Sequence, residues 1–177
     1  YGIYIMDADG TNTLKIIDAT GPFSWSPDGS KIVFVDERNG NREIYTINID
    51  GTNEKRLTNS AGYDGSPEWS PDGTKIAFSS SRDGDSEIYT MNPDGGNVQQ
   101  ITNDTHENYG SSWSPDGNKI MFKSDRDNRY YEIYVMNADG SDQTRITNNS
   151  SDYESVPSWS PDGTQIVYAS DKETSYK

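Results

Sequence analysis

Acidic side chains recur at close spacing in two short segments of this 177-residue chain. The five carboxylates concerned are Asp83, Asp85, Glu87, Asp125 and Asp127. Hard cations need several oxygen ligands, and alternate carboxylates around a glycine such as Gly84 can supply them from one side of a loop. We therefore predict a candidate calcium site here. Salt bridges are the competing interpretation, because arginines lie in equivalent segments: Arg38, Arg82 and Arg126.

The single histidine is the other residue whose type suggests chemistry. His106 lies close in sequence to Asp104 and Glu107. A catalytic serine normally needs such a base, yet the chain contains no Gly-x-Ser-x-Gly, His-Glu-x-x-His or phosphate-binding Gly-Lys motif. The absence of cysteine excludes thiolate catalysis and Cys-type zinc sites. We predict a protein that is not an enzyme. A glycan-active enzyme that uses the mouth of the central channel is the alternative, but carboxylates are so plentiful that the sequence singles out no catalytic pair.

Composition limits the classes of partner. The chain carries 29 acidic and 15 basic residues, a net charge of -14, so binding to nucleic acid is not expected. No apolar run approaches the roughly 18 residues of a membrane span. Only two leucines are present, which argues against a helical bundle. The apolar volume comes instead from aromatic and β-branched residues, including 12 tyrosines and 4 tryptophans.

Two strings repeat four times and define the elements that must position these side chains. The string Trp-Ser-Pro-Asp-Gly recurs at separations of 44, 44 and 46 residues, beginning at Trp25, Trp69, Trp113 and Trp159. A seven-residue string ending in Asp-Gly recurs in step, beginning at Tyr4, Tyr45, Tyr89 and Tyr134. Self-similarity at such a period is typical of a repeat architecture. We treat residues 1–177 as one domain.

Each unit reads as four strands joined by tight turns. In the second full unit, alternating apolar residues predict strands over Pro67–Ser70, Lys75–Ser80, Glu87–Asn92 and Val98–Thr102. The Ser-Pro-Asp-Gly string provides the turn between the first two strands. A repeated four-stranded meander of this length is typical of a propeller blade. We therefore predict an all-β fold, a β-propeller of four tandem four-stranded blades.

The repeats resemble the TolB-like β-propeller family, a WD-repeat-like group. The segments that carry the resemblance are Ser81–Gly84, Glu87–Asn92, Ile101–Asn103 and Trp113–Gly117. Members of the family include a periplasmic accessory protein that binds protein partners and propeller domains attached to serine peptidases. The resemblance thus implies a propeller in a periplasmic or extracellular protein, and it specifies fold better than function.

The two ends of the chain look like complementary halves of one blade. Tyr1 begins in a third strand, and the segment from Thr164 ends after a second strand. Counting from Trp159 through both ends to Trp25 gives 43 residues, close to the other repeat spacings. We predict a last blade closed by the N- and C-terminal strands. A ring of two chains with eight blades and a piece of a longer propeller remain open, so the chain is a monomer or a homo-oligomer through its terminal strands.

Function is expected on the face of the propeller that carries variable loops. One face holds near-identical turns, whereas the loops entering each blade differ from unit to unit. Their candidate ligand-binding residues are Tyr63, Asp64, His106, Glu107, Tyr109, Asp152 and Tyr153. Tyrosine offers contact area and a polar tip, although these rings can equally serve to pack each loop on its neighbouring blade. We predict a non-catalytic scaffold that binds a protein or small-molecule partner, with a structural module assembling through terminal strands as the alternative.

Overall fold

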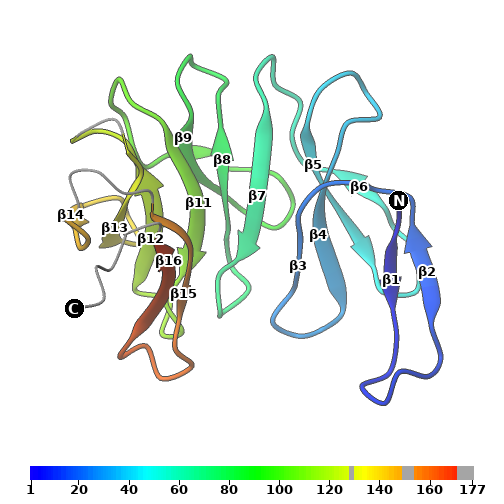
Figure 1. Ribbon diagram of the computed structural model, residues 1–177. Coiled ribbons are helices and arrows are strands. Elements are labelled where there is room, and N and C mark those ends of the chain that lie inside the picture. Colours follow the sequence, from blue (N-terminus) through cyan, green and yellow to red (C-terminus); the bar gives the residue numbers. More distant parts are fainter. Residues whose placement is uncertain (128–129, 149–153, 171–177) are drawn as a thin grey trace.

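A computed structural model of the protein describes residues 1–127, 130–148 and 154–170, without the side chains of 154–156. These residues form sixteen strands and no helix (Figure 1). Accordingly, the described part of the chain contains no helix with the length and apolarity to cross a membrane. The all-β prediction is confirmed.

Three complete blades form the middle of the molecule, each an antiparallel meander of four strands in sequence order. The first blade comprises β3 (Phe23–Trp25), β4 (Lys31–Asp36), β5 (Glu43–Asn48) and β6 (Lys55–Arg56). The second comprises β7 (Asp64–Trp69), β8 (Ile76–Ser80), β9 (Glu87–Met91) and β10 (Gln99–Gln100). The third comprises β11 (Asn108–Trp113), β12 (Lys119–Ser124), β13 (Glu132–Asn137) and β14 (Thr144–Arg145). The predicted four-stranded unit is therefore present.

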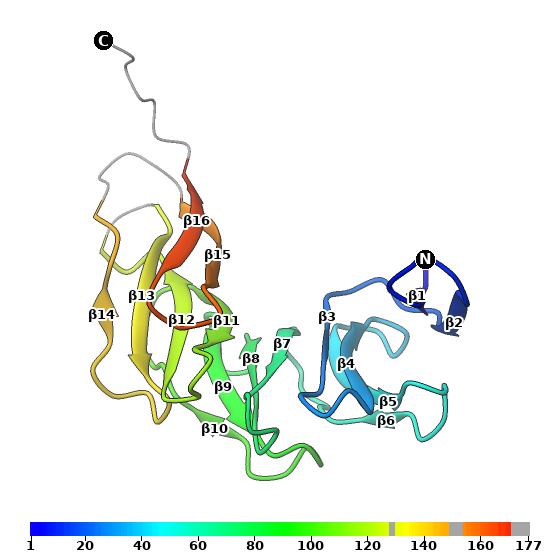
Figure 2. The same ribbon diagram turned by 90° about the horizontal axis from the view of Figure 1, so that it is seen from below.

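The remaining strands form two half-blades at opposite ends of an open arc. The N-terminal half-blade pairs β1 (Ile3–Ile5) with β2 (Leu14–Ile17), and the C-terminal one pairs β15 (Glu154–Trp159) with β16 (Ile166–Ser170). Figure 2 shows the two half-blades apart, with β3, β7, β11 and β15 on the concave side of the arc. The prediction of a last blade closed by the terminal strands is not confirmed. Repeat spacing fixes the length of a blade, whereas closure depends on the rotation between neighbouring sheets, which packing of their faces determines.

The repeated turns between the first two strands of each unit lie together on the face at the bottom of Figure 1, which we call the turn face. In the second blade, Gly73 adopts a φ of 71° and its N–H donates to the Ser70 carbonyl oxygen at 2.8 Å. The Asp72 carboxylate accepts hydrogen bonds from the Ser70 hydroxyl at 2.6 Å and the Thr74 N–H at 3.0 Å. This aspartate is a turn former, as the sequence predicts.

Hydrophobic cores lie between blades. Trp69 of β7 packs against Val33 and Val35 of β4, in a cluster of buried side chains that joins the first and second blades. Within each blade a phenylalanine stacks on a tyrosine of the next strand; Phe34 and Tyr45, for example, have ring centroids 5.6 Å apart. Burial of this aromatic surface, together with that of isoleucine, valine and methionine side chains, stabilises a domain with so few leucines. The packed sheets hold the loops of the opposite face, which we call the loop face, in fixed positions.

Candidate functional site

A cavity of about 670 Å³ opens on the loop face where the three complete blades meet. Four of the predicted binding residues line it: Tyr63, Asp64, Glu107 and Tyr109. They come from the first residues of β7 and β11 and from the loops that precede those strands. The structure therefore brings together residues that are more than 40 positions apart in sequence.

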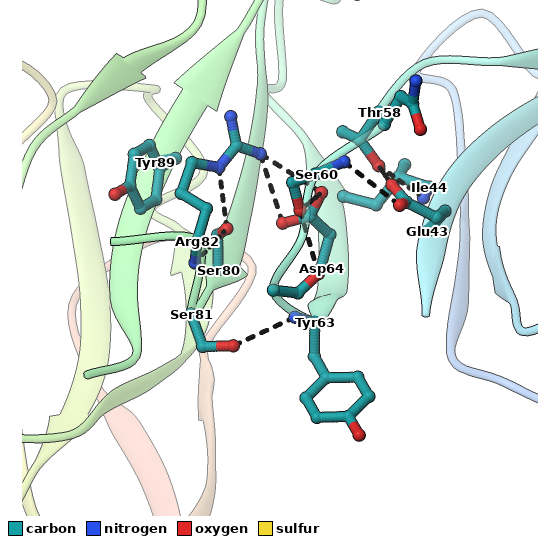
Figure 3. Close-up of polar contacts among 12 residues, drawn as sticks. Glu43, Ile44, Thr58, Ser60, Tyr63, Asp64, Ser80, Ser81, Arg82 and Tyr89 are labelled. Carbon is teal, nitrogen blue, oxygen red and sulfur yellow. Dashed lines mark hydrogen bonds and ion pairs between the residues drawn. The ribbon is translucent and has the colours of Figure 1, made fainter. Parts of the chain in front are cut away.

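Tyr63 has a fixed backbone and a free side chain. Its N–H donates to the Ser81 hydroxyl at 2.9 Å, and its carbonyl oxygen accepts from the Ser81 N–H at 3.0 Å. The preceding Gly62 permits this close approach, because a Cβ there would lie 2.4 Å from the Ser81 carbonyl carbon. Figure 3 shows the Tyr63 ring pointing away from the polar network, and the residue is 65% exposed. An aromatic ring is thus presented to solvent from a rigid base.

Asp64, in contrast, is fully buried and engaged within the protein. Both of its carboxylate oxygens lie 3.2 Å from Nη2 of Arg82, and the Ser60 hydroxyl donates to one of them (Figure 3). Arg82 is itself held by the Ser80 hydroxyl at 2.8 Å and lies over the Tyr89 ring at 4.8 Å. Asp64 therefore has a structural role at the base of the cavity, where it holds Arg82 and the loop that contains Ser60.

Glu107 and Tyr109 form the opposite wall of the cavity. Glu107 Oε2 accepts a hydrogen bond from the Ser86 N–H at 3.0 Å. Burial, followed by the hydrogen bond to Glu107, raises the pKa of Tyr109. The Tyr109 ring also contacts Tyr131 edge to face, with centroids 5.9 Å apart. This tyrosine combines the two interpretations of the sequence, since it packs on its own blade and keeps part of its surface at the cavity.

An ion pair that the sequence analysis did not single out completes the rim. Arg42 Nε lies 2.7 Å from Glu37 Oε1, and both side chains are more than half exposed. Serine hydroxyls of the second blade also line the wall, among them Ser79 and Ser81. The sequence offered little reason to select Arg42, because an arginine stands immediately before the first residue of the third strand in only one repeat.

Of the other predicted binding residues, only His106 lies in the described part of the chain, and it does not line this cavity. The His106 side chain has Nδ1 3.5 Å from Asp104 Oδ1. The backbone N–H of His106 donates to the same oxygen at 2.9 Å, and the residue is outside the cavity lining. It is a loop residue hydrogen-bonded to Asp104, and it has no hydrogen bond to a serine hydroxyl in the part of the chain that the structure describes. Asp152 and Tyr153 lie outside the described residues.

Four of the five candidate metal ligands accept hydrogen bonds from separate groups of the protein. Asp83 accepts from the Tyr89 hydroxyl at 2.7 Å, and Asp125 accepts from the Glu107 N–H at 3.0 Å. Asp127 accepts from the Tyr134 hydroxyl, and within the described residues no hydrogen bond or ion pair is found for Asp85. Among the described residues there is no group of three histidines or carboxylates that could hold a metal. Calcium stays a prediction that this geometry does not support.

Glu87 belongs to a buried polar motif that recurs in all three complete blades. In the first blade, Thr58 donates its hydroxyl to Glu43 Oε2 at 2.6 Å and accepts from the Ile44 N–H at 2.9 Å (Figure 3). Arg56 adds an ion pair to Glu43 at 2.9 Å. The motif fastens the last strand and the following loop to the blade. A glutamate and a threonine 15 residues apart in each unit signal it in the sequence.

The second blade departs from this pattern beside the cavity. Gln100 occupies the position of Arg56, and Glu87 accepts instead from Asn108 Nδ2 at 2.8 Å and from the Asp104 N–H at 2.8 Å. Burial raises the pKa of Glu87. The loop that leads to Tyr109 is therefore tied directly to the second blade.

A further acidic group lies on the concave side of the arc. Glu68 of β7 occupies a position held by serine in the other repeats, and it accepts from the Ser112 hydroxyl of β11 at 3.4 Å. Burial raises the pKa of this carboxyl to about 7. The replacement of serine by glutamate in one repeat was the feature of the sequence that could have identified this position.

Comparison with known proteins agrees with this architecture. The family model of the TolB beta propeller domain matches residues 17–174. The chain belongs to this TolB propeller family. The curated relatives include the Tol-Pal system protein TolB of Thioalkalivibrio sulfidiphilus, 36% identical over 65 residues, which are 35% of this chain and 15% of that protein. TolB of Alcanivorax borkumensis is 33% identical over 72 residues, 38% of this chain and 17% of that protein. This TolB-like propeller thus matches about one sixth of the length of these relatives.

Solved structures extend the likeness over nearly the whole TolB-like propeller. TolB from Acinetobacter baumannii superposes with a TM-score of 0.81 at 28% identity, covering 95% of this chain and 42% of that one. A putative TolB from Agrobacterium tumefaciens gives 0.80 at 28% identity, covering 96% and 65%. An oligogalacturonate lyase in complex with manganese shares the fold alone, with a TM-score of 0.68 at 23% identity and coverage of 91% and 48%.

Proposed function

We propose that the loop-face cavity is the binding site of a protein partner and that the chain acts there as a non-catalytic scaffold. The observation that carries the proposal is the pair of tyrosines, Tyr63 and Tyr109, that flank one cavity from adjacent blades. Their backbones are held by hydrogen bonds and strand pairing, so little conformational entropy is lost when a partner binds. Aromatic anchors on a rigid frame are typical of interaction sites.

The charges around the cavity favour a basic segment of the partner. Asp64 is neutralised by Arg82 and Glu37 by Arg42, whereas Glu107 has no cationic partner within the part of the chain that the structure describes. A lysine or arginine side chain entering between the rings would meet this carboxylate and contact the ring faces. The net charge of -14 adds long-range attraction that weakens as salt increases.

The relatives support a role in a protein assembly. Those matched are Tol-Pal system proteins, so a protein partner and a periplasmic location are parts of this proposal. An extracellular location finds no support among them. The enzymes among the structural neighbours, a lyase, a synthase and two peptidases, are less than 25% identical and bear on the fold alone.

Titration calorimetry with a lysine-rich decapeptide tests the proposal, with a glutamate-rich decapeptide as the probe control. We expect the basic peptide to bind the wild-type chain and the double variant Tyr63→Ala/Tyr109→Ala to lose at least tenfold in affinity. Tyr1→Ala is the matched control, since Tyr1 is fully exposed and outside the cavity lining. Equal affinity of the double variant and the wild type would contradict the proposal.

A further inference from the structure

The loop-face cavity lies beside positions where the second blade has small side chains and the third blade has large ones. Across β7 and β8, Gly65 pairs with Ser79. At the equivalent positions of β11 and β12, Tyr109 pairs with Lys123. Gly65 and Ser79 both line the cavity. The cavity is therefore open at positions that the next blade occupies with a ring and a long aliphatic chain.

The residue immediately before the third strand differs in the same direction. It is Ser86 in the second blade, where it lines the cavity, and Tyr131 in the third. The Tyr131 ring contacts Tyr109 edge to face, and Lys123 Nζ lies 5.8 Å from the centroid of the same ring. The third blade thus packs its three large side chains together, whereas the second blade has small residues at all three positions.

The backbone of the second blade does not require glycine at position 65. Glycine in a strand usually serves an unusual φ or the close approach of another group. Gly65 is not among the glycines with positive φ, and a Cβ added to it would meet no atom within 4 Å. The next residue, Ser66, has a φ of 50°, whereas its equivalent in the third blade is Gly110 with a φ of 67°. Local backbone geometry therefore does not account for Gly65, and the space above it is open.

The third blade shows which kind of side chain fits these positions. Lys123 Cε lies 3.5 Å from the point where a Cβ on Gly110 would be placed, so the lysine chain runs beside β11 toward the ring of Tyr131. Burial lowers the pKa of Lys123, because removal from water disfavours its charge. A lysine side chain is thus accommodated there, at a cost that a nearby carboxylate would offset.

The second blade has such a carboxylate at the corresponding point. Glu107 Oε2 accepts a hydrogen bond from the Ser86 N–H at 3.0 Å, and Ser86 is the equivalent of Tyr131, beside which the Lys123 ammonium lies. A lysine that entered the second blade along the path of Lys123 would bring its ammonium to Glu107. The charge of this carboxylate is complementary to such a side chain.

We propose that Gly65, Ser79 and Ser86 determine the specificity of the loop-face cavity, because together they form a pocket for one lysine side chain of the partner. The aliphatic part takes the path that Lys123 follows in the third blade, and the ammonium binds Glu107. A compact ammonium with three donors suits this small site better than a planar guanidinium. This inference rests on the proposed function, since the cavity is the same, and it adds the group that is recognised and the residues that select it.

Titration calorimetry with the lysine-rich decapeptide tests the pocket in the variant Ser79→Lys. This substitution places the lysine of the third blade in the second, where it would occupy the pocket and neutralise Glu107. We expect the peptide to lose at least tenfold in affinity. Ser79→Ala is the matched control, because it removes the hydroxyl that accepts from the Gly110 N–H at 3.1 Å but leaves the pocket open. Its affinity should remain within twofold of the wild type.

Two further measurements keep the test independent of any one variant. Gly65→Tyr fills the pocket from the opposite strand, and we again expect at least a tenfold loss, with circular dichroism spectra of both filling variants verifying the fold. An arginine-rich decapeptide of the same length should bind the wild-type chain at least fivefold more weakly than the lysine-rich one.

The outcomes separate this inference from the proposed function. Unchanged lysine-peptide affinity in a folded filling variant, while Tyr63→Ala/Tyr109→Ala is weakened, would overturn the pocket alone. Equal or tighter binding of the arginine-rich decapeptide would also overturn it. A wild-type chain that binds neither decapeptide would overturn both proposals.

Discussion

The two faces of the arc use the same residue type, the aspartate, in different ways. On the turn face, Asp28, Asp72 and Asp116 accept hydrogen bonds from their own turns and have no ion pair among the described residues. Hydrogen bonds from serine hydroxyls lower the pKa of Asp28 and Asp116 to about 2. On the loop face, the buried Asp64 carboxylate pairs with Arg82, which lies 18 positions away in the loop that follows β8.

This difference explains why one face repeats and the other varies. A turn that is satisfied within five residues needs nothing from its neighbours, so the same string works in every unit. A loop whose ion pairs and hydrogen bonds cross between strands can change in one unit when its partner changes too. The loop face is therefore the part of the molecule where individual positions can acquire a binding role.

The largest expected effect comes from breaking a buried ion pair of the loop face. Arg82→Ala leaves the fully buried Asp64 without its cation, and we expect the free energy of unfolding to fall by about 3 kcal/mol. Urea denaturation at pH 7 measures this change. Arg42→Ala is the control, because its pair with Glu37 is exposed and should contribute less than about 0.5 kcal/mol. Equal losses in the two variants would contradict this view of the loop face.

A smaller effect is expected on the concave side, and it depends on pH. Burial raises the pKa of Glu68 to about 7 from the ordinary value of 4.5, so the folded state binds more protons than the unfolded state between these values. This contribution to stability is present below pH 4.5 and is lost as the pH rises through 7. Glu68→Gln should abolish this dependence and gain about 2 kcal/mol at pH 8. Denaturation of both proteins from pH 4 to 8 tests it, and parallel curves would refute it.

A substitution on the turn face should lower the free energy of unfolding by a smaller amount, and that amount should be the same in every unit. Ser70→Ala removes the hydroxyl that donates to Asp72 and accepts from the Lys75 N–H, so we expect a loss of about 1 kcal/mol. Thermal unfolding of Ser70→Ala and of its equivalent Ser114→Ala measures the effect. Midpoint shifts that differ widely between them would show that the turns are not independent units.

Removal of the exposed rings should have the smallest effect on stability. Tyr63 makes its hydrogen bonds through its backbone, so Tyr63→Ala should change the free energy of unfolding by less than about 0.5 kcal/mol while weakening peptide binding. Denaturation and calorimetry on the same sample separate the two. A large loss of stability would indicate that this ring packs the loop and has no part in binding.

The repeated elements could be predicted from the sequence because their causes are local. The strand alternation and the Ser-Pro-Asp-Gly turns depend on residues within a few positions of each other. Tyr63 and Tyr109 could be predicted to lie on the loop face, because the loops that contain them vary between units. The structure places both at one cavity. The sequence could not show that Asp64 forms an ion pair with Arg82, because they are 18 positions apart and only the folded sheet brings them together.

Closure of the ring was not confirmed, and calcium binding stays a prediction that the contacts of the acidic residues do not support. The 43-residue count is a statement about length, whereas in the structure β1 and β16 belong to separate two-stranded sheets. Likewise, Asp83 and Glu87 alternate in sequence, yet the first bonds to Tyr89 and the second is buried against Thr102. In both cases the spacing of residues in the sequence did not determine which groups are in contact in the folded chain.

Amide hydrogen exchange with and without the lysine-rich decapeptide tests the contrast between the two faces most directly. The account predicts slower exchange in the peptide complex at the cavity segments, 62–66, 79–86 and 106–110, and unchanged exchange at the turn segments 70–74 and 114–118. Protection centred on the turns, with the cavity segments unaffected, would contradict it and would assign peptide binding to the turn face instead.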